Sequence, residues 1–175
     1  MVTAKTADLD TPSRVSIVRL CVAAHREDDF RNLFVYVPSG DLHFLAFEAE
    51  VLVSHALVTT RWLQPEGWPP LKTAYVDAVA TLPGRQGLGY GTKVMQRLAA
   101  EVDREYLIAC LETEEVPFYS RLGWQLWRGP LGGRSEQGLI PTPEQSGIMI
   151  LRLSQTPVLN LDSALTIECQ GTRIW

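Results

Sequence analysis

The sequence has no run of about 18 apolar residues, so it predicts no transmembrane helix. Its first ten residues, MVTAKTADLD, lack a cationic start followed by an apolar core, and we therefore expect no signal peptide. Cysteine is also scarce, because Cys21, Cys110 and Cys169 are odd in number and too widely spaced for a disulfide framework or a CxxC metal site. These absences favour a cytoplasmic protein with reduced cysteines.

Basic runs are absent as well, and the 16 Lys and Arg residues against 20 Asp and Glu residues give a net charge of −4. Such a balance argues against nucleic-acid binding. The three histidines, His25, His43 and His55, have no acid or cysteine at ligand spacing, so we expect no metal site. Without a repeat or linker, the 175 residues are expected to form a single domain over 1–175.

Alternating and helical hydrophobic patterns predict the order of the elements. The predicted strands are 2–7, 42–48, 51–63, 72–82, 106–112, one that starts at Trp124, and 147–153. The predicted helices are 12–25, 88–105 and a short one ended by Gly123, while 26–34 is a loop or short helix and 129–146 a long loop. Thr11 is the expected cap of the first helix, and the C-terminal tail is expected to dock. The order predicts an α/β fold with a mixed, mostly antiparallel sheet and helices on both faces.

The stretch YVDAVATLPGRQGLGYGTKVM, residues 75–95, joins a strand to a helix through closely spaced glycines. It is not a Walker A loop, because no Gly-Lys-Ser/Thr follows, and it lacks the context of a Rossmann fingerprint. Glycines at a helix start let main-chain N–H groups approach an anion. A tight turn that needs glycine only for packing explains the residues equally well.

Gln86-Gly87-Leu88-Gly89-Tyr90-Gly91 matches the pattern Q/R-x-x-G-x-G/A, and PFYSRLGW downstream matches F/L-Y-x-x-x-G-F/W. With these motifs the chain resembles the GCN5-related N-acetyltransferases. The resemblance implies acetyl-coenzyme A as co-substrate, without a metal. It places the pyrophosphate on the main chain of Gln86, Gly87, Leu88, Gly89, Tyr90 and Gly91, and the pantetheine arm on Val79 and Thr81.

TADLD, YVDAVA, PTPEQSG and the ending LD-S-A…C…W resemble, within that superfamily, the aminoglycoside 2'-N-acetyltransferases over nearly the whole chain. This resemblance implies acetylation of the 2'-amine of an aminoglycoside, and hence antibiotic resistance in a bacterial cytoplasm. We also expect a homodimer. The alternatives are another small amine or a protein N-terminus as acceptor, or a non-catalytic coenzyme A sensor.

Two residues are assigned chemistry by the resemblance. Tyr119 is the expected general acid for the leaving thiolate, although a half-buried helix aromatic would look the same in sequence. Asp77 is the expected base where the family carries Glu, and its shorter side chain favours a water relay over direct contact. A solvated acid that only attracts a cationic substrate is the other interpretation of Asp77.

The residues expected to bind the acceptor are Asp29, Phe34, Ala78, Glu112, Glu144, Gln145, Arg173 and the terminal Trp175, with Glu114 and Glu115 as further carboxylates. Where relatives carry acids, this chain has Phe34, Gln145 and Arg173, so its cleft is less acidic. An arginine suits a substrate that has its own carboxylate. Kasugamycin, an aminoglycoside with an acid group and a 2'-amine, is therefore the favoured substrate.

Overall fold

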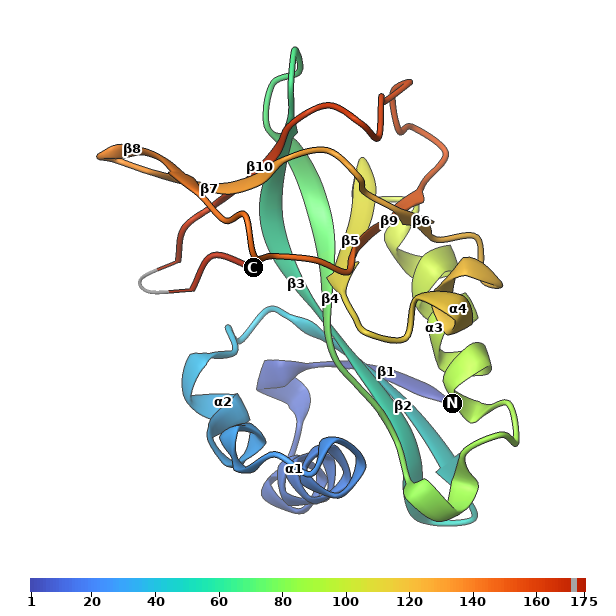
Figure 1. Cartoon of the computed structure of the whole chain (residues 1–175). Coiled ribbons are helices and arrows are strands. Elements are labelled where there is room, and N and C mark those ends of the chain that lie inside the picture. Colours follow the sequence, from blue (N-terminus) through green and yellow to red (C-terminus); the bar gives the residue numbers. More distant parts are fainter. Residues whose placement is uncertain (171–172) are drawn as a thin grey trace. The chain divides into compact units, whose positions relative to one another are not determined.

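The computed structural model describes residues 1–170 and 173–175. Its strands are β1 (Val2–Lys5), β2 (Leu42–Glu48), β3 (Val51–Pro65), β4 (Leu71–Thr81), β5 (Ile108–Glu112), β6 (Gln125–Leu126), β7 (Leu131–Ser135), β8 (Gly138–Pro141), β9 (Ile148–Arg152) and β10 (Leu165–Glu168). Its helices are α1 (Thr11–His25), α2 (Leu33–Tyr36), α3 (Tyr90–Val102) and α4 (Val116–Ser120). Short 3₁₀ turns occupy Thr6–Asp8, Asp28–Asn32 and Pro83–Arg85. The predicted mixed sheet with helices is confirmed (Figure 1).

The chain divides into two compact units. Unit 1 comprises Met1–Thr59 and Val76–Glu101, and unit 2 comprises Thr60–Tyr75 and Val102–Trp175. The long strands β3 and β4 contribute residues to both units. Each unit has a buried cluster of its own residues.

Unit 1 is built on the antiparallel strands β1, β2 and β3, against which helix α1 packs. Ile17, Leu20 and Cys21 of α1 are buried in one cluster with Leu57 of β3 and Ala78 of β4. The helix is capped by Asp10, whose Oδ1 accepts the Ser13 N–H at 2.9 Å, rather than by Thr11 as predicted. The two residues are adjacent and both can cap a helix, so composition did not separate them.

Helix α3 confirms the predicted amphipathic pattern. Val94, Met95, Leu98 and Val102 recur at helical spacing, and all four are buried. The helix begins two residues later than predicted, at Tyr90, because Gly87 and Gly89 have positive φ angles that a helix cannot contain.

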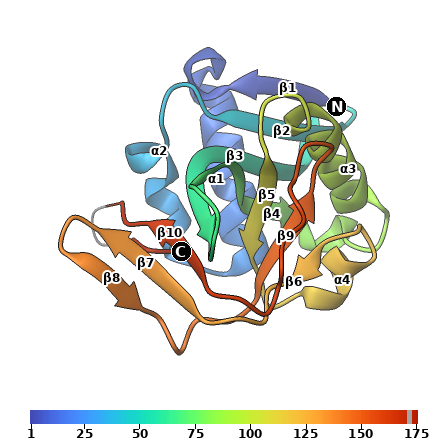
Figure 2. The same cartoon turned by 90° about the horizontal axis from the view of Figure 1, so that it is seen from above.

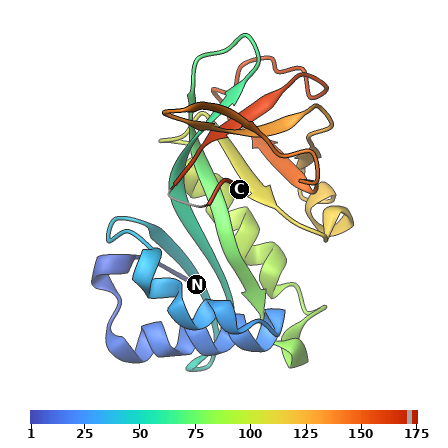
Figure 3. The same cartoon turned by 60° about the vertical axis from the view of Figure 1, so that its left-hand side comes forward.

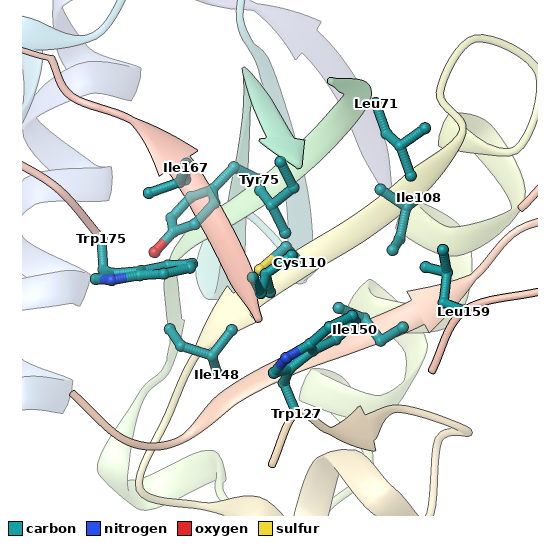
Figure 4. Close-up of a cluster of buried hydrophobic side chains, with 12 residues drawn as sticks. Leu71, Tyr75, Ile108, Cys110, Trp127, Ile148, Ile150, Leu159, Ile167 and Trp175 are labelled. Carbon is teal, nitrogen blue, oxygen red and sulfur yellow. The ribbon is translucent and has the colours of Figure 1, made fainter. Parts of the chain in front are cut away.

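In unit 2 the strand order is β6-β9-β5-β4-β3-β10-β7-β8, with β3 and β4 represented by their unit 2 residues. The β10–β7 pair is parallel, and the other strand pairs of described register are antiparallel. Aliphatic side chains of β5 and β9 form the centre of the core, and Trp127 and Trp175 pack around them (Figure 4). The Trp127 ring N–H is satisfied by the Ser163 carbonyl at 2.8 Å.

The predicted loop at 129–146 is wrong over much of its length, because it contains the antiparallel hairpin β7–β8. Glycine disfavours strands, so the Gly-Gly pair in β7 hid this strand from composition. A close approach requires glycine there: a Cβ at Gly133 would lie 2.8 Å from the Sγ atom of Cys169. The C-terminal residues lie beside the hairpin (Figures 2 and 3), and the predicted docking of the tail is confirmed.

A buried arginine ties β3 to the C-terminal segment within unit 2. Arg61 is 1% exposed, and its Nε donates to Oε1 of Glu168 at 2.7 Å. Its Nη2 donates to the carbonyl oxygens of Glu168 and Ile174 at 2.6 and 2.7 Å, and its guanidinium lies 5.2 Å from the centre of the Tyr75 ring. This side chain therefore joins β3 to the main chain of Glu168 and Ile174.

No helix among the described residues is long and apolar enough to cross a membrane.

Candidate active site

Near its C-terminal end, in unit 1, strand β4 has an irregular backbone conformation at Ala78, the residue after the predicted base Asp77. Ala78 has a φ angle of 48°, a left-handed conformation that costs a residue with a side chain about 1–2 kcal/mol. Its N–H donates to Oδ1 of the preceding Asp77 at 2.7 Å, and its carbonyl lies 2.9 Å from Nδ1 of His55. Strained residues of this kind persist only where their surroundings fix them, and they concentrate at functional sites.

The glycine turn follows this strand within unit 1. Gly87 and Gly89 have φ angles of 76° and 84°, and a Cβ at either position would meet no atom within 4 Å. The backbone conformation, rather than lack of space, therefore requires glycine here. Helix α3 starts immediately afterwards, and its first N–H groups have no partners within the helix. The turn thus presents main-chain donors with open space around them, which suits an anion.

An ion pair anchors the two ends of this turn to β2. Arg85 and Tyr90 both bind the Glu48 carboxylate, with the Tyr90 hydroxyl donating to Oε1 at 2.8 Å. The hydrogen bond from Tyr90, followed by that from Arg85, lowers the pKa of Glu48. A cavity of about 270 Å³ lies beside the pair and is lined by Glu48, by Val51 and Val53 of β3, and by residues 82–85. Sequence reasoning missed Glu48 and Arg85, which lie 37 residues apart and outside the motif.

Two histidines that looked like isolated strand residues form a buried hydrogen-bonded chain in unit 1. Nδ1 of His43 lies 2.9 Å from Nε2 of His55, and Nε2 of His43 lies 3.0 Å from the Thr6 hydroxyl. Neither imidazole has exposed surface. Burial lowers the pKa of His43 to about 3 and the pKa of His55 to about 4, so both rings are neutral at pH 7.

We predict that acid destabilises the protein through these imidazoles. Both histidines take up protons near pH 6.5 in the unfolded chain but not in the native state, so unfolding becomes easier as the pH falls. Asp41 opposes this effect, because burial raises its pKa to about 6 and the native carboxyl is protonated first. The net difference of roughly one proton lowers the free energy of unfolding by about 1.4 kcal/mol per pH unit between about pH 6 and 4.

Urea unfolding followed across this pH range measures the slope. The control is Asp41→Asn, which removes the opposing carboxyl and should make the decline about twice as steep. An unchanged slope in Asp41→Asn, or a free energy of unfolding that stays constant from about pH 6 to 4, contradicts the prediction.

Tyr119, the predicted general acid, lies on helix α4 in unit 2 and is 7% exposed. Its ring makes edge contacts with Phe118 and Trp124, with centroids 4.9 and 6.0 Å apart. Burial, assisted by the charge of Glu115, raises the pKa of Tyr119 to about 12. The phenol is therefore protonated at neutral pH, as a proton donor must be.

Several predicted acceptor residues meet in unit 2. The Gln145 amide donates to Oε1 of Glu112 at 2.6 Å. The Trp175 ring is 7% exposed, and its N–H donates to the Thr142 hydroxyl at 3.0 Å. Arg173 donates to the Trp175 carbonyl oxygen at 2.9 Å, and its guanidinium lies 5.6 Å from the centre of the Tyr75 ring. Arg173 thus holds the chain end and remains exposed.

The remaining predicted site residues are distributed over both units. Unit 1 contains Asp29, Phe34, Asp77, Ala78, Val79, Thr81 and residues 86–91. The half-buried Phe34 stacks on His43 and lies under Arg14, whereas Asp29 is exposed. In unit 2, Glu144 is exposed next to the Gln145–Glu112 pair. Among residues 1–170 and 173–175, no group of three or more His, Cys, Asp or Glu side chains is arranged to hold a metal ion.

Comparison with known proteins decides the family. Residues 5–127 match the family model of the acetyltransferase (GNAT) domain. The chain belongs to the GNAT acetyltransferase family. It is 28% identical, over 94% of its length and 85% of the relative's, to the aminoglycoside 2'-N-acetyltransferase of Mycolicibacterium fortuitum. The resemblance inferred from the glycine motif and from PFYSRLGW is therefore confirmed at the level of the family.

Solved structures show the same fold. A GNAT family acetyltransferase from Brucella melitensis, solved in complex with acetyl-CoA, superposes with a TM-score of 0.61 at 14% identity, over 97% of this chain and 96% of that one. Eis1 from Mycobacterium abscessus gives a TM-score of 0.60 at 19% identity over 74% of this chain, which spans only 33% of that longer protein. The chain is thus an acetyltransferase of the GNAT type, and the glycine turn of unit 1 lies within the matched residues 5–127.

Proposed function

We propose that this acetyltransferase transfers the acetyl group of acetyl-coenzyme A to the 2'-amine of an aminoglycoside. The observation that carries the proposal is the kinked end of β4 in unit 1, where the Asp77 carboxylate is followed by the strained Ala78 and then by the glycine turn. The Mycolicibacterium fortuitum relative, which matches over 94% of this chain, supports the aminoglycoside as acceptor. The family match over residues 5–127 takes in parts of both units, which supports one acetyltransferase domain over 1–175.

Acetyl-coenzyme A contains a pyrophosphate and a thioester. The residues of unit 1 are suited to binding the pyrophosphate. Gly87 and Gly89 leave space at the turn, and the start of α3 supplies N–H donors, so residues 86–91 would hold the pyrophosphate largely through the main chain. Val79 and Thr81 would offer main-chain groups of β4 to the pantetheine arm. The Brucella melitensis acetyltransferase of the same fold was solved in complex with acetyl-CoA, which supports acetyl-coenzyme A as the co-substrate.

The chemical roles follow from the needs of acyl transfer. The C–N bond forms as the C–S bond breaks, and the acceptor ammonium must first lose a proton. Asp77 takes this proton, through a water because its side chain is one methylene shorter than glutamate. The Val79 N–H donates to the thioester oxygen as negative charge develops there. Tyr119, protonated at neutral pH, gives a proton to the leaving sulfur.

The acceptor is proposed to be kasugamycin. The Glu112 carboxylate accepts a hydrogen bond from the Gln145 amide, and the exposed Arg173 adds a positive charge near Trp175. An arginine at this position favours an aminoglycoside with an acid group over one that is only a polycation. Such an activity would confer resistance in a bacterial cytoplasm, and the expected homodimer rests on the same family resemblance.

Parallel assays of kasugamycin and a 2-deoxystreptamine aminoglycoside test the proposal. Release of the coenzyme A thiol and mass analysis of the product should show acetylation of kasugamycin. Turnover of only the second drug would refute kasugamycin as substrate, and turnover of neither would overturn the aminoglycoside assignment.

Arg173→Gln should raise KM for kasugamycin about tenfold, as expected for the loss of a charged contact. The exposed Arg104→Gln, which makes the same charge change elsewhere in unit 2, is the matched control.

A further inference from the structure

The hydrogen-bonded chain of Thr6, His43 and His55 ends on the strained residue next to Asp77. Strand pairing explains how these side chains meet. His43 of β2 lies opposite Leu57 of β3, so His55, two residues before Leu57, points to the same face of the sheet. Cys21 of α1 covers this face, with its sulfur 3.9 Å from both Nδ1 of His55 and the Ala78 carbonyl oxygen. The hydrogen-bonded side chains of Thr6, His43 and His55 are therefore enclosed by the core of unit 1.

The Ala78 carbonyl fixes the direction of every hydrogen bond in this chain. A carbonyl can only accept, so Nδ1 of His55 must carry its proton, at a distance of 2.9 Å. Because the ring is neutral, Nε2 of His55 is then an acceptor, and Nδ1 of His43 must donate to it. Nε2 of His43 is in turn an acceptor, so the single proton of the Thr6 hydroxyl goes to this nitrogen at 3.0 Å rather than to the Asp41 carbonyl oxygen at 3.3 Å. The opposite direction would place two acceptors, Nδ1 of His55 and the Ala78 oxygen, against each other.

Both main-chain groups of Ala78 are consequently held. Its carbonyl accepts from His55, and its N–H donates to the Asp77 carboxylate at 2.7 Å. The peptide unit on each side of Ala78 thus has one fixed orientation, which maintains the left-handed φ angle of 48°. Since the same N–H binds Oδ1 of Asp77, the orientation of the carboxylate depends on that of the Ala78 backbone.

We propose that Thr6, His43 and His55 are positioning residues for the acetyl transfer, because they hold the Ala78 backbone in the conformation that orients the Asp77 carboxylate. This inference rests on the proposed role of Asp77 as base. Neither histidine exchanges protons with the substrate. The charged and titratable groups around the chain are Arg14, which lies over the Phe34 ring stacked on His43, the Cys21 thiol, Asp41 and Asp77 itself.

Two substitutions of His55 separate positioning from bulk packing. His55→Leu removes the donor to Ala78 and should lower kcat about 10- to 100-fold, as a small displacement of a reacting group does. KM for acetyl-coenzyme A should change less than about twofold, because the glycine turn is untouched. His55→Asn places an amide nitrogen where Nδ1 of His55 lies, and it should recover most of the lost kcat. Equal losses in both variants would overturn the proposal.

The decisive comparison is made in an Asp77→Asn background. If His55 acts through the Asp77 carboxylate, His55→Leu costs less than about twofold in kcat once that carboxylate is gone. The same fold-loss in both backgrounds assigns His55 to general structure and overturns the inference. An Asp77→Asn variant with undiminished kcat would instead remove the base role on which the inference rests. The two failures are thus distinguishable.

A second variant and a spectroscopic measurement do not depend on the stability of His55→Leu. Thr6→Val keeps the shape of the side chain and should lower kcat about two- to fivefold, whereas Thr60→Val, which removes a similar hydrogen bond to Tyr106 in unit 2, should not. Nitrogen NMR at pH 7 should show both His43 and His55 as neutral rings with the proton on Nδ1. A proton on Nε2 of either ring, or equal kcat in the two threonine variants, contradicts the directed chain.

Discussion

Asp77→Asn should lower kcat about 100-fold near pH 6 and far less near pH 9, because at high pH more of the acceptor amine is already deprotonated. The amide keeps the size of the side chain and can still accept the Ala78 N–H, so the loss reports the missing proton acceptor rather than altered packing. Release of the coenzyme A thiol at saturating substrates, measured across this pH range, gives the two profiles.

Two further variants calibrate this result. Asp77→Glu restores a carboxylate of the length found in the resembling family and should recover at least part of kcat. Glu136→Gln removes an exposed carboxylate between β7 and β8 in unit 2 and should leave both profiles unchanged. If Asp77→Asn lowers kcat by the same factor at every pH, Asp77 contributes only its charge. If kcat of Asp77→Asn equals that of the unsubstituted enzyme at every pH, Asp77 has no part in the mechanism.

Arg61→Met should have the largest effect on stability, a loss of about 3–5 kcal/mol in the free energy of unfolding. Arg61 is almost completely buried, and its removal takes the guanidinium donor from Oε1 of Glu168 and from two carbonyl oxygens, while Oε2 of Glu168 keeps the Trp62 N–H. Breaking such a pair costs more than the pair contributes, because the partly buried Glu168 carboxylate and the two carbonyl oxygens lose the donor that offset their removal from water. Urea unfolding of both proteins at pH 7 measures the difference.

The double variant Arg61→Met/Glu168→Gln tests that explanation. Removing the second charge should recover part of the loss, since the Glu168 carboxylate then no longer lacks its arginine partner. The matched surface pair is Arg97 and Glu101 on α3, where Arg97→Met should cost less than about 0.5 kcal/mol. A loss below about 1 kcal/mol for Arg61→Met would show that water reaches the guanidinium.

Local patterns predicted the parts of this fold that depend on neighbours in sequence. The apolar side of α3 could be read from the spacing of Val94 and Leu98, and the glycine turn from a motif six residues long. Strand β7 was missed because glycine is depleted in strands, and Gly133 lies in one where another chain segment approaches closely. That segment contains Cys169, more than thirty residues later in the sequence.

The same distinction between local patterns and long-range contacts applies to the residues of the candidate site. Asp77 and Tyr119 were found because motifs resembling a known family contain them. His43 and His55 were not found, since an imidazole in a strand has no pattern that distinguishes a packed residue from a hydrogen-bonded one. Their role depends on the register between β2 and β3 and on the φ angle of Ala78, neither of which a single sequence displays.

The partners of Arg61 also bear on how the chain folds. Glu168 and Ile174 lie 107 and 113 residues after it in the sequence, whereas His43 and His55 are 12 residues apart. Contacts between distant residues form slowly, because closing a long loop costs entropy before any contact is gained. During synthesis on the ribosome, the Arg61 guanidinium must therefore stay hydrated until β10 has emerged. We expect the histidine pair to become protected from hydrogen exchange well before the segment around Arg61.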